Sequence, residues 1–298
     1  MSSVKNVSSE IRSDEKNKIL GKTLYLVATP IGNLLDLSER ALKVLSEVDF
    51  IAAEDTRNSQ HLLMHFGISK PLVSYFEHNK RERGEQIVAR LEAGESCALI
   101  TDAGTPAISD PGEDLVALCA DRGIAVTSIP GACAGITALT LSGLPTGRFT
   151  FEGFLSVNKA ERRERLSELK YERRTMIFHE APHKLCATLD DFAATFGGER
   201  RIALCRELTK LNEEVLRMTL SEAVEYYREK SPRGEYVLIL EGATEAVAKE
   251  GLFWENMTVR EHVEHHILSG MEKMDAIKLT AKERGVHKNE VYKEMIDK

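Results

Sequence analysis

Five short apolar runs, separated by stretches with helical periodicity, dominate the first half of the chain. The runs are TLYLVA, FIAA, LVSY, CALIT and IAVTSI, at residues 23–28, 50–53, 72–75, 97–101 and 124–129. Compact runs of this kind are typical of strands that are buried on both faces of a sheet. Between the first two runs, Leu37, Ala41 and Leu45 repeat at helical spacing. The alternation predicts an α/β fold with a parallel sheet and helices on its faces.

A second set of strands and helices begins after the sequence LPTG. Its apolar runs lie at 149–155, 175–178, 201–205 and 236–241, with helical patterns at 159–171, 182–196 and 221–228. After Gly242 the strand pattern stops, and three short helical stretches separated at Gly270 and Gly285 predict a small module of helix-turn-helix type. The expected parts are therefore a flexible tail (1–22), an N-terminal α/β domain (23–146), a second α/β domain (147–243) and a small helical domain (244–298).

Composition restricts the class of protein further. No window approaches 18 uninterrupted apolar residues, and the polar N-terminus lacks the apolar stretch of a secretory signal, so we expect a cytoplasmic protein. The five cysteines are odd in number and form no Cys-x-x-Cys, which predicts reduced, buried residues. The net charge of −7 excludes a uniformly basic nucleic-acid coat, although a local basic patch can still bind a phosphate backbone.

Three loops rich in small residues follow predicted strands. They are ATPIGNL at 28–34, TDAGTPAISDPG at 101–112 and PGACAG at 130–135. The glycine patterns of the common dinucleotide and triphosphate sites are absent, which disfavours a dehydrogenase or a nucleotide hydrolase. Small residues let backbone amides and carbonyls approach a ligand closely, although ordinary turn chemistry explains any one loop alone. Because parallel strands place their carboxyl ends at one edge, the three loops together predict a ligand site.

Two groups of histidines invite a metal-site interpretation. His179, Glu180 and His183 match the letters H-E-x-x-H, but Pro182 disfavours a continuous helix through both histidines. The cluster of His262, His265 and His266 lies on a charged helical stretch, and we expect it to be a solvated face. No metal is therefore predicted.

Basic residues are frequent at 158–174, a stretch with seven basic and four acidic residues. A solvated helix with internal ion pairs and a surface that contacts phosphates remain equal alternatives for this stretch. A second charged segment, RELTK at 206–210, follows directly on the strand pattern RIALC, at the kind of strand end where sites form.

Eight motifs in register resemble the tetrapyrrole-methylase fold family, most closely its branch of 16S rRNA ribose 2′-O-methyltransferases. They are ATPIGNLLDLSERAL (28–42), AAEDTR (52–57), ITDAGTPAISDPG (100–112), PGACAGITAL (130–139), FEGFL (151–155), HEAPHK (179–184), RELTK (206–210) and RGEYVL (233–238). The resemblance implies two α/β domains with S-adenosylmethionine in the cleft between them, and a homodimer. It implies methylation of a ribose 2′-hydroxyl, of a cytidine in the decoding centre, in the 16S rRNA of the small ribosomal subunit.

The resemblance also implies which residues form the site. Cofactor contacts are expected at Pro30, Ala103, Gly104, Thr105, Ile108, Cys133, Ala134, Glu180, Ala181 and Leu208. A 2′-hydroxyl needs a base that takes its proton or a cation that stabilises its alkoxide, and the candidates are Asp55 and Lys210. RNA contacts are expected at Arg57, Arg206, Arg162, Arg163 and Arg165.

Two other functions stay open at this point. One is a methyltransferase that acts on a tetrapyrrole or another small acceptor, for which the basic stretch and the helical tail are not needed. The other is a non-catalytic RNA-binding or ribosome-assembly factor, which would not bind S-adenosylmethionine.

Overall fold

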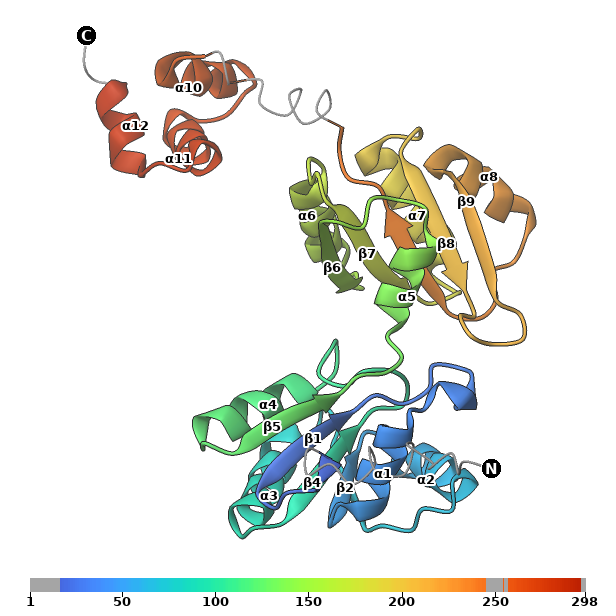
Figure 1. Cartoon of the computed structure of the whole chain (residues 1–298). Coiled ribbons are helices and arrows are strands. Elements are labelled where there is room, and N and C mark those ends of the chain that lie inside the picture. The colour runs from blue at the N-terminus through green and yellow to red at the C-terminus, as the bar shows by residue number, and fades with distance from the viewer. Residues whose placement is uncertain (1–16, 245–253, 255–256, 296–298) are drawn as a thin grey trace, which may run out of the picture. The chain divides into compact units, whose positions relative to one another are not determined.

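The computed structural model describes residues 17–244, 254 and 257–295 (Figure 1). The predicted flexible tail falls mainly on residues 1–16, which lie outside the described residues. The chain divides into two compact units. The first comprises Met1–Arg162 with Thr175–Glu241, and the second comprises Arg163–Arg174 with Gly242–Lys298.

The first unit begins with a five-stranded sheet of strand order β3-β2-β4-β1-β5, in which all neighbours are parallel. Its strands are β1 (Thr23–Val27), β2 (Phe50–Ala53), β3 (Leu72–Ser74), β4 (Ser96–Ile100) and β5 (Ala125–Ile129). The helical segments between and after them are η3 (Leu34–Asp36), α1 (Glu39–Glu47), α2 (Thr56–His65), α3 (Lys80–Glu92), α4 (Gly112–Asp121) and α5 (Ala134–Leu141). The predicted parallel α/β architecture is confirmed. Strand β5 differs from the prediction, because it is an edge strand that leaves Thr127 and Ser128 exposed.

Strand β1 shows how the sheet is covered on both faces. Tyr25 and Val27 belong to an apolar cluster with residues of α1, whereas Leu24 belongs to a second cluster with residues of α3 and α4. Side chains of a strand alternate between faces, so a nearly continuous apolar run is what a doubly covered strand requires. Leu45 of α1 is fully buried, and truncating such a leucine to alanine typically costs about 2–5 kcal/mol.

The first unit also contains a second five-stranded sheet, of order β6-β7-β10-β8-β9. Its strands are β6 (Phe149–Phe154), β7 (Thr175–Glu180), β8 (Arg201–Arg206), β9 (Glu214–Thr219) and β10 (Tyr236–Leu240), with helices α7 (Leu185–Phe196) and α8 (Leu220–Glu229). Helix α6 (Lys159–Leu169) begins in the first unit and continues into the second from Arg163 onward. Strands β6 and β7 are parallel, and the remaining pairs are antiparallel. The sequence prediction omitted β9, whose half-buried residues form no apolar run.

Helix α5 connects the two sheets of this unit. Ala138 and Leu139 of α5 are buried in one cluster with Ile177, Ala203 and Ile239 of the second sheet. By packing, α5 belongs to the second sheet, although it precedes the boundary that the sequence pattern places after residue 146. Helix α5 packs against β7 and β10, and Figure 1 shows it beside the second sheet, where the chain leaves the first.

The second unit contains three short helices, as the pattern predicted: α10 (Val259–Leu268), α11 (Lys273–Arg284) and α12 (Lys288–Glu294). Val263, Ile277 and Val291, one from each helix, lie in a small apolar cluster. Helix α11 ends at Gly285, whose φ of +66° suits the left-handed conformation that glycine tolerates best. Within the described residues, no helix combines the length and the apolar character that crossing a membrane requires.

The cysteines are all unpaired. Cys97, Cys119 and Cys205 are buried, as predicted. Cys186 is exposed and Cys133 is half-buried, so the expectation of buried cysteines is wrong for these two.

Candidate functional site

The three loops rich in small residues meet at one edge of the first sheet, as the sequence predicted. They follow β1, β4 and β5, and these strands are parallel neighbours. The Thr29 N–H donates to the Gly104 carbonyl at 2.9 Å, and the Gly104 N–H donates to the Thr29 carbonyl at 3.1 Å. The Thr105 hydroxyl donates to the Ala132 carbonyl of the third loop at 2.9 Å. Backbone and side-chain hydrogen bonds therefore hold the loops as one wall.

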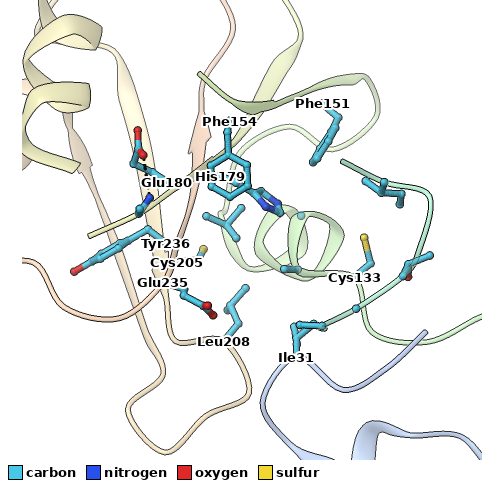
Figure 2. A pocket seen from close by; sticks show the side chains of 18 of the residues that line it. Ile31, Cys133, Phe151, Phe154, His179, Glu180, Cys205, Leu208, Glu235 and Tyr236 are labelled. Atoms are coloured by element: carbon cyan, nitrogen blue, oxygen red, sulfur yellow. Dashed lines mark hydrogen bonds between the residues drawn. The ribbon is translucent and has the colours of Figure 1, made fainter. Parts of the chain in front are cut away.

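This wall bounds a cavity of about 520 Å³, and elements of the second sheet supply its other side (Figure 2). The volume is in the range of small-molecule and cofactor pockets. All the predicted cofactor contacts except Pro30 line it, and Ile31 lines it beside that proline. The lining also includes Gly135, Phe151, Phe154, His179, Pro182, His183, Cys205, Lys210, Glu235, Tyr236 and Val237. The structure thus brings together residues that lie more than 100 positions apart in the sequence.

The loop after β4 has a strained backbone. Gly104 has φ +85°, and Ala107 and Ser109 have φ of +65° and +63°. A non-glycine residue in this region costs on the order of 1–3 kcal/mol and persists only when its surroundings hold it. The Asp110 carboxylate supplies that restraint, because it accepts hydrogen bonds from the N–H groups of Ala107, Ile108 and Gly112 at 2.8–3.1 Å. Such strain is common at ligand sites.

The H-E-x-x-H letters do not form a helix. His179 and Glu180 end strand β7, and Pro182 and His183 lie in the turn before α7. The two histidines therefore do not share a helical face, as the proline predicted. The buried Glu180 carboxylate accepts hydrogen bonds from the Ala181 N–H at 2.9 Å and from the Thr188 hydroxyl, which fixes the turn that closes the cavity (Figure 2).

Sequence reasoning considered His179 only as a metal ligand and did not include it among the cofactor or RNA contacts, but the structure makes it a functional candidate. Its Nε2 is buried without a hydrogen-bond partner. The rings of Phe151 and Phe154 each meet the imidazole edge to face, with centroids 5.4 Å away. Burial lowers the pKa of the imidazole, against a weaker opposing effect of Glu235, so His179 is neutral at physiological pH. Its place in the HEAPHK motif was the one available signal.

Lys210, a predicted catalytic residue, lines the cavity as a cation. Burial disfavours the charge, but hydrogen bonds to the carboxylates of Glu235 at 2.9 Å and Glu207 at 3.0 Å outweigh it and raise the pKa of the ammonium group. The loop around Gly32 lies tightly against this segment, because a Cβ at Gly32 would come within 2.5 Å of Lys210 Cγ. Lys210 is therefore held in place and positively charged.

The other predicted polar residues lie outside the cavity lining. Asp55 caps α2 by accepting the Arg57 N–H at 2.8 Å, and its carboxylate pairs with the Arg57 guanidinium at 3.1 Å. The hydrogen bond from the Arg57 side chain lowers the pKa of the Asp55 carboxyl, which makes it a weaker base. Arg206 pairs with Glu214 at 3.1 Å.

The three arginines of α6 differ from one another. Arg162 is largely buried, and it donates to Asp191 at 2.6 Å and to the Thr188 hydroxyl at 2.9 Å. Arg165 is half-exposed and pairs with Glu168 at 3.0 Å, and Arg163 is exposed. Arg162 and Arg165 therefore fit the ion-pair alternative, and phosphate contact stays a prediction for the exposed Arg163.

The histidine cluster of α10 is not the solvated face that the sequence predicted. His265 is exposed, but His262 is fully buried and His266 is nearly so. Both Nε2 atoms lie 2.8 Å from the Glu283 carboxylate, which satisfies them on the inside of the small helical unit. Periodicity could not reveal this, because the carboxylate comes from α11.

Among the described residues of this unit, His262, His266 and Glu283 lie close enough together to hold a metal ion. The Arg284 guanidinium donates to His262 Nδ1 at 3.1 Å, so the neutral ring carries its proton on Nε2. A metal-ligating histidine instead offers one nitrogen lone pair to the metal and donates a proton from the other. The arrangement therefore favours a hydrogen-bond network over a metal site.

Comparisons with known proteins agree with this geometry. The model of the tetrapyrrole (corrin/porphyrin) methylase family matches residues 23–224. A ribosomal RNA small subunit methyltransferase I from Halalkalibacterium halodurans is 52% identical over 270 residues, which cover 91% of this chain and 93% of that protein. The protein of that name from Bacillus subtilis is 47% identical over 270 residues, 90% of this chain and 92% of the relative.

Solved structures with the same fold are more distant in sequence. A diphthine synthase superposes with a TM-score of 0.57 at 14% identity, over 76% of this chain and 93% of that one. A uroporphyrin-III C-methyltransferase from Thermus thermophilus gives 0.52 at 20% identity, over 78% of this chain and 98% of that one. These two likenesses concern the fold.

Proposed function

The chain belongs to the tetrapyrrole methylase family, and on that premise we propose that it is an S-adenosylmethionine-dependent methyltransferase of small-subunit ribosomal RNA. The observation that carries the proposal is the high identity to ribosomal RNA small subunit methyltransferases I over nine-tenths of the chain. The proposed acceptor is the 2′-hydroxyl of a cytidine ribose in the decoding centre of 16S rRNA. The proposed setting is the cytoplasm, with a homodimer as the working form.

The cavity fits the cofactor on the evidence of its own residues. Its wall consists of small residues, and Gly104 leaves open the space that a Cβ would take beside Ile31 and the Ala132 carbonyl. The Ala103–Thr105 turn, Cys133 and Ala134 would hold the cofactor from the first sheet, with Ala181 and Leu208 opposite them. When bound, S-adenosylmethionine supplies an electrophilic methyl group on a positively charged sulfur.

Lys210 is the proposed catalytic cation. Loss of the proton from a ribose hydroxyl leaves negative charge on the oxygen, and a fixed ammonium in a partly buried cavity stabilises such charge. Its two carboxylate partners keep Lys210 protonated, so it would act by electrostatics rather than as a base. Asp55 remains the proposed base, and Arg57 and Arg206 remain proposed contacts to the RNA.

Methyl transfer tests the function directly. Small ribosomal subunits and free 16S rRNA from a strain that lacks this gene would be incubated with the protein and tritiated S-adenosylmethionine. We expect label in RNA at one position that becomes resistant to alkaline cleavage, because a methylated 2′-oxygen cannot attack the adjacent phosphate. Label that appears only in an added tetrapyrrole would replace the proposal with the small-acceptor alternative, and failure to bind the cofactor would favour a non-catalytic RNA-binding factor.

Two substitutions separate the proposed catalytic roles. Lys210→Met removes the charge but keeps the aliphatic stem, and it should lower kcat much more than it changes cofactor affinity. Asp55→Asn should lower kcat at neutral pH and should alter the acidic limb of the pH profile. If Asp55→Asn turns over at the wild-type rate, the base must be another group.

A further inference from the structure

Three side chains form an aromatic rim on the cavity: Phe151 and Phe154 of β6, and His179 of β7. Phe151 is 40% exposed and Phe154 is 61% exposed, so both rings keep surface that a ligand can contact. A bulge in β6 between Phe151 and Gly153, where Gly153 has φ +61°, shifts the register so that both rings flank His179. Bulges often re-aim side chains next to sites.

His179 adds an unsatisfied polar atom to this rim. A Cβ built on Gly135, in the first turn of α5, would lie 3.7 Å from Nε2 and 3.5 Å from Phe151 Cε2, so the imidazole is directed along the cavity wall (Figure 2). A buried nitrogen without a partner is costly, and each such atom in a native protein calls for an explanation. A ligand that supplies the missing hydrogen bond explains it.

The rim is shared by two adjoining hollows. Phe151, Phe154 and Ile108 line the main cavity and also a second, more open hollow of about 560 Å³. The second hollow is completed by Ala107 and Ser109, the residues with strained backbones, together with Glu113, Glu152 and Gly153. A ligand that enters from the open hollow therefore passes the exposed phenylalanines before it reaches the wall proposed for the cofactor.

We propose that the aromatic rim is the subsite for the acceptor nucleotide, in which Phe151 and Phe154 stack the unpaired base and His179 Nε2 hydrogen-bonds to the same nucleotide. The inference rests on the proposed function and names the part of the site that binds RNA. Enzymes that do chemistry on a base take its nucleotide out of the helical stack and hold the base against aromatic or apolar side chains, and an unpaired nucleotide would likewise bring its ribose into this cavity. Aromatic platforms of this kind are also how proteins bind single-stranded RNA.

The cofactor is the less suitable occupant of the rim. Phe151 and Phe154 also line the open hollow, whereas the proposed cofactor contacts of the cavity, Ile108 excepted, line only the main cavity. An acceptor that belongs to a large RNA must instead arrive from solvent and leave again. The exposed rings serve an occupant that is present only during turnover.

Methylation kinetics with small ribosomal subunits test the rim. Stacking on one aromatic side chain corresponds to a roughly 5- to 150-fold effect when that side chain is truncated. Phe154→Ala should raise KM for the subunit by a factor in this range and leave the calorimetric affinity for S-adenosylmethionine unchanged. Phe154→Trp should restore the wild-type KM, because it keeps the stacking surface. Phe149→Ala is the matched control, since Phe149 lies on the same strand at 41% exposure but does not line either hollow.

His179→Leu distinguishes a ligand-binding role from a structural one. Removal of an unsatisfied buried nitrogen should leave the melting temperature equal or higher, whereas KM for the subunit should rise. A melting temperature that falls with unchanged KM would assign His179 to the core instead.

Other outcomes would overturn the subsite without touching the proposed function. Wild-type KM in Phe154→Ala would exclude stacking, and weaker cofactor binding in that variant would assign the rim to the cofactor. A changed molecular mass in light scattering would assign the rim to a subunit interface. If the wild-type protein does not methylate the subunit, the proposed function itself is wrong. In that case every variant, the control Phe149→Ala included, is equally inactive, which distinguishes this outcome from failure of the subsite alone.

Discussion

Gly104→Ala separates two roles of this glycine in the cavity wall, namely adopting a positive φ and letting the turn approach the cofactor closely. At φ +85° a side chain is strained wherever it points, and the cost is about 1–2 kcal/mol. The new Cβ would also lie 3.3 Å from Ile31 Cγ2, which must give by a few tenths of an ångström, and at an ordinary contact distance of 3.5 Å from the Ala132 carbonyl oxygen. If the backbone at residue 104 relaxes to relieve the strain of its positive φ, the pair of hydrogen bonds that joins this residue to Thr29 weakens.

The magnitudes follow from these contacts. A loss of about 1–2 kcal/mol lowers the melting temperature by roughly 2–8 °C in a unit of this size. If the displaced turn loses one hydrogen bond to the cofactor, a loss of about 0.5–1.5 kcal/mol, the dissociation constant rises roughly two- to tenfold.

Gly94→Ala is the matched control for backbone strain. Gly94 has φ +102°, a Cβ added there would meet no atom within 4 Å beyond its own chain neighbours, and it does not line the cavity. Differential scanning calorimetry should therefore show comparable losses of melting temperature in both variants. Titration calorimetry should show weaker S-adenosylmethionine binding in Gly104→Ala alone. Wild-type cofactor affinity in Gly104→Ala, beside the expected loss of stability, would refute the assignment of this turn to the cofactor.

Two further predictions concern α6 and the helical unit. Replacing Arg163 and Arg165 with Gln should flatten the salt dependence of RNA binding by up to about 0.9 log unit per lost phosphate contact, taking duplex DNA as the guide. Arg162→Gln should instead lower the melting temperature and leave that slope unchanged, because Arg162 is paired with Asp191. Equal slopes in all variants would show that α6 does not contact RNA phosphates. Burial lowers the pKa of His262, so as the pH falls the unfolded chain is protonated at this residue before the folded protein is. The neutral His262 therefore stabilises the fold fully above the unfolded pKa of about 6.5, and this stabilisation is lost as the pH falls toward the folded pKa. Trp254, the single tryptophan, stacks on His262 at 5.3 Å, so its fluorescence during denaturation at pH 7.5 and pH 5.5 measures that loss, and a midpoint that does not move would contradict it.

Local patterns determined the elements of this protein and the wall of its site. The apolar run 23–28 and the helical spacing of Leu37, Ala41 and Leu45 predicted β1 and α1. This was possible because the burial of a strand or of one helix face produces a repeat of apolar residues within a short stretch of sequence. The three loops were predictable at one edge for a similar reason, since parallel strands end on the same side. Pro182 likewise disfavoured a helix through both histidines of its motif by local sterics alone, and the structure has none there.

Tertiary structure decided the state of the polar side chains, because each depends on partners from distant elements. Arg162 is held by Asp191 of α7, and His262 is buried through Glu283 of α11. The same holds for His179, whose Nε2 is buried beside Phe151, Phe154 and Gly135 and has no hydrogen-bond partner. Periodicity in one segment reports how much of that segment is buried, but the charge and hydrogen bonding of a side chain are determined by contacts across the sequence.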